Sequence, residues 1–280
     1  MSGFFAALLD PAFPFIRNAL FAGLLASVLF GVLGALVTVR RIAGLAGAVS
    51  HAVLGGIGLA LFLQARNLVP GFSPVAGALL FALLAAFIIG IVSLKAKQRE
   101  DTVINAIWAI GMSIGVLFLA KTPGYTDPSS YLFGNILLLS ERDLVLLAVL
   151  DLVVVFLSWR FYPQIKACSF DEEFARVRGV PASAFFLALL ALLALAIVLL
   201  QNFVGIVMVI AMLTLPAGSA SNIAKNLVSL MVYSALASAL FSAGGLVLGW
   251  ALDLPVGAVT VILAGLVFLA AAAHKALRGR

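Results

Sequence analysis

The 280-residue sequence is 64% apolar and 10% charged, and its mean hydropathy is +1.24. A soluble domain is usually about half apolar and a quarter charged, so this composition argues against a water-soluble protein and for one that lies in lipid. The net charge of +6 is explained by membrane topology, and no nucleic-acid partner is expected. The single cysteine, Cys168, provides neither a disulfide framework nor a Cys-based metal site.

Nine apolar runs follow one another along the chain, and their continuous Leu- and Ala-rich composition predicts helices rather than barrel strands. The runs lie at 15–39, 49–63, 74–94, 102–120, 143–159, 182–200, 203–215, 227–250 and 256–273. A span needs roughly 20 residues, so the seventh run is either a tilted span or a buried segment. Gln201 and Asn202 separate it from the sixth run and are expected to end both helices. The predicted fold class is therefore all-α, a polytopic membrane helical bundle of eight to nine spans.

The basic residues predict the orientation of the spans. Most of the 17 lysines and arginines fall in alternate loops, starting with the loop after the first span. The opposite set of loops holds only Arg17, Arg66, Lys121 and Arg142. The positive-inside rule then places the N-terminus outside and the C-terminus in the cytoplasm. We expect a multi-pass protein of a bacterial or archaeal cytoplasmic membrane.

The longest cytoplasmic connection, 160–181, carries the signals of a short, well-capped helix. Ser169 and Glu172 have the spacing of a capping box. Gly179 is placed to stop the helix, and Pro181 prevents its continuation. The sequence therefore predicts a helix at about 169–179, outside the membrane.

One face of this predicted helix is apolar. Phe170, Phe174 and Val177 follow the spacing i, i+4, i+7 and form a single stripe. The stripe is typical either of a helix that rests on the membrane surface or of one that fits a groove on a cytoplasmic partner.

Six stretches resemble, in order, the permeases of zinc and manganese ABC importers. They are SHAVLGG at 50–56, REDTVI at 99–104, YLFGN at 131–135, FDEEFARVRG at 170–179, VGIVMVIAMLTLP at 204–216 and DLPVG at 253–257. Each stretch is a weak signal alone, but the ordered set is specific for the family, although not for the metal. The resemblance extends over nearly the whole chain, from about residue 20 to 273.

The resemblance implies a single permease domain over residues 1–280, with a fold like that of the vitamin B12 and metal permeases. It implies a homodimer with its pore on the two-fold axis, a cytoplasmic ATPase dimer, and an extracytoplasmic metal-binding protein that delivers the ion. The helix at 169–179 resembles the coupling helix on which the ATPase docks. The residues expected to make that contact are Phe170, Asp171, Glu172, Glu173, Phe174, Val177 and Gly179.

The expected function is import of a divalent transition metal by alternating access, with zinc as the first choice and manganese or iron as alternatives. The chain has no phosphate-binding P-loop, so ATP is expected to bind to the partner. The chain is thus expected to be a transport subunit without a cofactor of its own rather than an enzyme. A secondary transporter driven by an ion gradient is the alternative, and it would carry several intramembrane acids.

Three polar residues within predicted spans are candidates for the ion path: His51, Ser50 and Asp151. Imidazole suits zinc, manganese or iron, although a hydrogen-bonded packing histidine is the alternative. Ser50 points about 100° away from His51 on a helix and could instead bond across helices. Asp151 either makes a polar contact between helices or lies on the ion path.

The sequence departs from the family pattern at Gly47. Family members often carry an acidic residue there, three positions before the serine of the Ser-His pair. The missing carboxylate puts the metal-gating site and the metal preference in question.

Overall fold

A computed structural model of the chain describes residues 8, 10, 12–69, 71–95, 100–123, 134 and 139–278. These residues form helices and the turns between them, as predicted for an all-α protein. The helices are α2 (Pro14–Val39), α3 (Ala43–Ala65), α4 (Pro74–Lys95), α5 (Glu100–Lys121), α7 (Glu141–Arg160), α8 (Tyr162–Phe170), α9 (Glu172–Val177), α10 (Ala182–Ala220), α11 (Leu227–Leu252) and α12 (Val256–Arg278).

The helices confirm the predicted number of spans. Among the described residues, 8 segments are long and apolar enough to cross a membrane, or up to 9 if the bent pair of α7 and α8 counts as one broken span. These two helices meet at an angle of 76°. The second span begins earlier than predicted, at Ala43, because its first turn is made of small residues that add little hydropathy.

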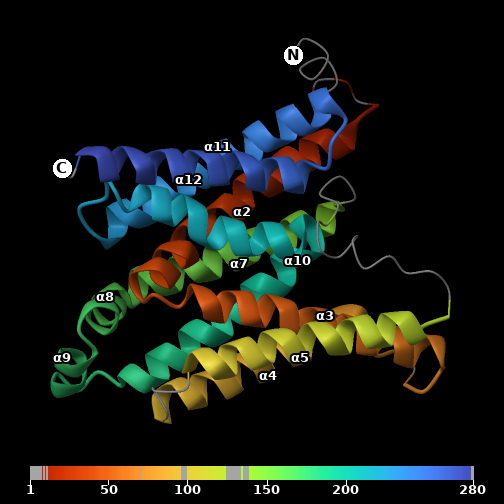
Figure 1. Cartoon of the computed structure of the whole chain (residues 1–280), viewed down its shortest axis with the longest axis horizontal. Helices are drawn as coiled ribbons and strands as arrows, with labels where there is room; N and C mark the ends of the chain where they lie inside the picture. Colours follow the sequence, from red (N-terminus) through yellow and green to blue (C-terminus); the bar gives the residue numbers. More distant parts are fainter. Residues whose placement is uncertain are drawn as a thin grey trace.

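The connections between helices lie at the two ends of the bundle, in the same two sets into which the basic residues divide the loops (Figure 1). One end holds the α2–α3 joint, α8, α9, the α10–α11 turn and the C-terminal end of α12. The other end holds the start of α2, the α3–α4 connection and the α11–α12 turn. The chain therefore alternates between the two ends as the sequence predicts.

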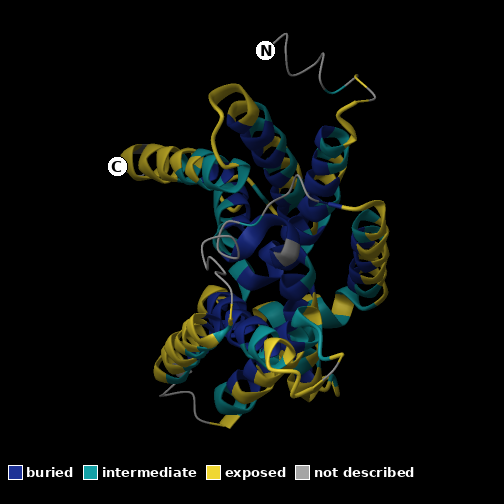
Figure 2. Ribbon diagram, turned by 90° about the vertical axis from the view of Figure 1, so that its right-hand side faces the viewer, coloured by how far each residue is buried: buried dark blue, intermediate teal, exposed yellow. Residues whose placement is uncertain are grey.

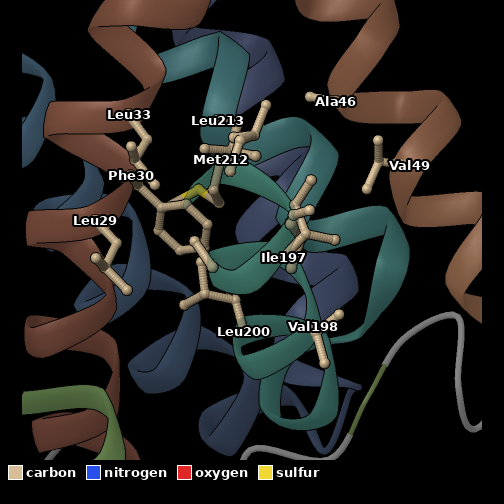
Figure 3. Close-up of a cluster of buried hydrophobic side chains, with 14 of the residues drawn as sticks. Leu29, Phe30, Leu33, Ala46, Val49, Ile197, Val198, Leu200, Met212 and Leu213 are labelled. Carbon is tan, nitrogen blue, oxygen red and sulfur yellow. The ribbon is translucent and has the colours of Figure 1, made fainter. Parts of the chain in front are cut away.

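The core lies where α2, α3 and α10 meet. Phe30 of α2 is fully buried and its ring lies beside Met212 of α10, with Ile197 and Leu213 nearby (Figure 3). The buried residues run through the centre of the molecule, and the exposed ones lie on its outer helices (Figure 2). Many of the exposed side chains are large and apolar, as is expected of helices that face lipid.

The sixth and seventh spans are two helices that meet at a kink within α10, and the position of this kink corrects the prediction for Gln201. The span segments are Ala182–Gln201 and Phe203–Ala220, and no loop separates them within α10. Gln201 is buried rather than placed in an outer turn, and the break comes at Gly205, with φ 79° and ψ 163°. Only glycine adopts this conformation readily, so Gly205 rather than a polar pair sets the bend.

Glycines bring α3 into backbone contact with its two neighbours. A Cβ atom on Gly56 of α3 would lie 2.0 Å from the carbonyl oxygen of Gly77 in α4. On the other side, a Cβ on Gly111 of α5 would lie 2.5 Å from Cα of Ala52. Small residues allow such close approach, which is a main source of helix association in lipid.

We expect Gly56→Ala to lower the free energy of unfolding in detergent by about 3 kcal/mol or more, since a buried methyl group must push α3 and α4 apart. Gly265→Ala on α12 is the matched control, because a Cβ there meets nothing within 4 Å. Unfolding would be followed by helical circular dichroism in both variants. Equal stability of the two variants would contradict the packing described here.

Candidate functional site

Two helices, rather than the single predicted one, form the segment between α7 and α10. Ser169 lies inside α8 and does not cap a helix, so the prediction of a helix at 169–179 is wrong at its start. The cap of α9 is Asp171, whose Oδ1 accepts a hydrogen bond of 2.9 Å from the backbone N–H of Phe174. Asp171 has an extended backbone, which ends α8 and starts α9.

The end of α9 is built as predicted, around Gly179. This residue has φ +78°, and its N–H donates to the carbonyl of Arg176 at 2.9 Å. The N–H of Val180 donates to the carbonyl of Ala175 at 3.0 Å, which completes a Schellman motif. Val180 also packs against the small buried cluster of Cys168, Ala175 and Ala182.

The predicted apolar stripe is exposed, although it is divided between the two helices. Phe170 ends α8, whereas Phe174 and Val177 lie on α9, and their exposed fractions are 62%, 50% and 88%. Asp171 and Glu173 are also exposed and Glu172 is half-buried, so acidic groups border the stripe. We define Phe170, Phe174 and Val177 as the apolar stripe; it lies at the end of the bundle that holds α9.

An ion pair joins α9 to the end of α2. Arg40 Nη2 lies 3.4 Å from Glu172 Oε2, and the guanidinium stands over the ring of Phe186 at 4.8 Å from its centroid. Glu172 also bonds to Arg176 within α9. Burial lowers the pKa of Arg40, and the negative charge of Glu172 opposes this effect by favouring the charged guanidinium.

His51 lies on α3, buried against an aromatic ring of α5. Its imidazole is 8% exposed and stacks on the indole of Trp108, with ring centroids 4.5 Å apart and planes inclined by 18°. His51 Nδ1 has no hydrogen-bond partner among the described residues. The alternative of a hydrogen-bonded packing histidine therefore finds no support at this nitrogen.

Ser50, next to His51, is fully buried and bonds within its own helix. Its Oγ donates to the carbonyl of Ala46 at 2.8 Å, which is the usual bond of a serine in an apolar helix. It makes neither the contact across helices nor a contact with the imidazole, and the structure does not bring it together with His51.

The space that an acid would need at position 47 is taken by Trp108. A Cβ atom on Gly47 would lie 2.9 Å from Trp108 Cζ3, and Gly47 is one turn before His51 on the same face of α3. The described residues hold no group of three or more His, Cys, Asp and Glu side chains that could bind a metal ion. The surroundings of His51 are thus aromatic rather than acidic.

Asp151 is buried on α7, and neither carboxylate oxygen accepts a hydrogen bond from the described part of the chain. The polar contact between helices that the sequence allowed is not formed there. Helix α7 packs mainly on α2, whereas α3 packs mainly on α4 and α5, so Asp151 and His51 lie on helices with different main neighbours. A buried carboxylate without a partner is costly, so it needs a proton, water or a cation.

Two of the sequence stretches meet at the bend of α10. Gly134 has φ +63°, and a Cβ on it would lie 2.4 Å from the backbone nitrogen of Gly205. The other residues of that stretch, 131–133 and 135, lie outside the described residues. No pattern in the sequence indicates this contact, because the fold alone brings the two glycines together.

The chain matches the model of the ABC 3 transport family over residues 12–275. A probable metal transport system membrane protein of Chlamydia muridarum is 35% identical over 256 residues, which cover 91% of this chain and 87% of that protein. The manganese import system permease protein ScaB of Streptococcus parasanguinis is 30% identical and covers 92% of this chain and 89% of that protein.

A solved structure, PsaBC from Streptococcus pneumoniae in complex with Fab, has the same architecture. Its matching chain has a TM-score of 0.84 at 30% identity and covers 96% of this chain and 94% of that chain. The match to the family model spans most of the sequence, and the relatives match it over most of their length. The chain therefore belongs to the ABC 3 transport family.

Proposed function

We propose that this chain is the membrane subunit of an importer that moves a divalent transition metal into the cytoplasm by alternating access. A separate ATPase supplies the energy. The observation that carries the proposal is the capped helix α9 with its exposed apolar stripe, in a chain whose relatives are named as metal and manganese permeases.

The apolar stripe suits a protein groove better than a membrane surface. Asp171, Glu172 and Glu173 start α9 and place negative charge beside the stripe. Cytoplasmic lipid leaflets carry negative charge and repel these acids, whereas they attract Arg176 and Arg178 at the other end of α9. A groove on the ATPase can instead bury Phe170, Phe174 and Val177 while the acids stay at its rim. The end of the bundle that holds α9 then faces the cytoplasm, together with the C-terminus.

A second copy of the chain is proposed to cover α5. This helix is among the least buried of the spans, and Asn105 and Ser113 are exposed on it. Polar side chains within a span seldom face lipid, and more often face protein or a water-filled path. Trp108 is 36% exposed and backs His51, so a path between two copies would pass along this face.

Zinc is the proposed cargo, with manganese and iron as the competing outcomes. An imidazole suits zinc, whereas carboxylate and carbonyl oxygens suit manganese. Beside His51, the indole of Trp108 occupies the space that an acidic side chain at position 47 would need. The candidate ligand is then a nitrogen atom without a neighbouring carboxylate, which favours zinc. Uptake of each metal alone and in competition, into proteoliposomes that hold the full assembly, would decide among them.

We expect Phe174→Asp to abolish ATP-driven uptake, because a carboxylate cannot enter an apolar groove without a partner. The variant should remain in the membrane and lose copurification with the ATPase. Ile223→Asp is the matched control, since Ile223 is 66% exposed in the α10–α11 turn but lies off α9. Normal uptake by Phe174→Asp would overturn the coupling role of the stripe. Uptake that needs an ion gradient and no ATP would favour a secondary transporter.

We expect His51→Phe to reduce metal uptake by about tenfold or more, since it removes the nitrogen ligand. The phenyl ring can keep the stack on Trp108, so thermal stability in detergent should change little. His51→Ala, which also loses the stack, separates the two effects. If His51→Phe transports normally, His51 is a packing residue and the ion path lies elsewhere.

A further inference from the structure

The segment α8–α9 is loosely seated on the bundle. A largely apolar cavity of about 500 Å³ lies between α8, α7 and α10, and Phe161, Cys168 and Leu189 are among its lining residues. A second, polar cavity of about 220 Å³ lies beside α9. Both spaces open to the surface, so α8 and α9 have unfilled space beside them into which the segment could shift.

Both ends of this segment are suited to act as hinges. At its start, α7 and α8 meet at 76° around Phe161. At its end, Gly179 has φ +78° and Pro181 precedes α10. Neither end continues a straight helix into the neighbouring span, so a displacement of α9 is not passed on through a rigid rod.

Side-chain packing also holds α9 weakly. Ala175 is the only residue of α9 that is buried, and it contacts a small cluster with Cys168 and Ala182. Phe174 and Val177 point to solvent. The ion pair of Glu172 with Arg40 also links α9 to the end of α2.

Arg40 stands between the two cavities and at a joint. It lines both of them, its side chain is 10% exposed, and the ring of Phe186 on α10 supports it. In the chain it caps α2 and is followed by Arg41 with φ 58°, after which α3 starts at Ala43. A force on the guanidinium therefore acts where α2 turns into the helix that carries His51.

We propose that the Arg40–Glu172 pair is the link that transmits movement of α9 to the α2–α3 joint, and through α3 to His51. The inference rests on the proposed function, because it takes the ATPase as the source of the movement. Arg40 and Glu172 are positioning residues: neither touches the metal, and each acts through the helix that it holds.

The test uses the complete permease–ATPase assembly in proteoliposomes, with its binding protein and zinc. We expect Arg40→Gln and Glu172→Gln each to lower the metal imported per ATP hydrolysed by roughly threefold to thirtyfold. The double variant should be no worse than either single variant, since both remove the same link. In Arg40→Gln, basal ATPase activity and copurification of the ATPase should persist, because the apolar stripe and the acids of α9 are intact. Arg40→Lys, which keeps the charge, should recover part of the coupling.

Arg41→Gln is the matched control, because it removes a cation from the same joint. Arg41 is exposed, and its side chain makes no hydrogen bond or ion pair with the described residues. The Arg41→Gln variant should import as much metal per ATP hydrolysed as the wild type. Cys168, the single cysteine, gives a second readout on α8. Its rate of alkylation by N-ethylmaleimide should change when ATP is added, both in the wild type and in Arg40→Gln.

If ATP still changes the alkylation rate of Cys168 in Arg40→Gln while metal import is lost, then the segment α8–α9 moves but the α2–α3 joint does not follow it. Wild-type coupling in Arg40→Gln would overturn the link. So would loss of the ATPase from that variant, which would make the pair only a brace for α9. Absence of ATP-driven uptake in the wild-type assembly would instead overturn the proposed function.

Discussion

The bundle depends on how closely its helices approach one another, because in lipid the burial of apolar side chains gains little. At α3 this requirement is met by glycines. Gly56 leaves room for Gly77 of α4, and Gly111 of α5 leaves room for Ala52, so main chains touch on both sides of the helix. With α3 held in this way, the face that carries His51 is directed at Trp108 of α5. The geometry of the candidate ion path is thus a consequence of glycine packing.

The spans were predictable because length and hydropathy are properties of the sequence alone. The stop at Gly179 was predictable for a similar reason, since a left-handed residue after a helix favours glycine. The start of α9 was not predictable. Ser169 and Asp171 can each cap a helix, and the choice depends on α8, whose last turn buries Cys168. Gln201 was misplaced because a polar residue between two apolar runs resembles a turn, whereas the bend comes at Gly205.

The residues that the sequence analysis did not single out have roles that depend on contacts between different helices. Trp108 looks like one more aromatic residue in an apolar run, and its importance comes from the stack on His51 and the space it takes beside Gly47. In the sequence, Arg40 is one of several basic residues that indicate which loops are cytoplasmic. Its ion pair with Glu172 is visible only in the fold. The sequence alone shows that Gly47 stands where an acid is often found, but only the fold shows that Trp108 fills the space beside it.

The two halves of the candidate machinery differ in packing as their tasks require. Around His51 the helices touch through their backbones, so the candidate ion path is lined by rigid elements and would change only when whole helices shift. Around α9 there are two cavities, two bends and, among the described residues, an ion pair to the end of α2, an arrangement that suits the proposed movement. Under the proposed function an imported ion must also be released, and a single imidazole against an indole would bind it more weakly than a cage of carboxylates. Weak metal binding between rigid helices, together with easy movement of α9, suits the proposed cycle. In that cycle ATP hydrolysis shifts whole helices and does not act on the metal ligand itself.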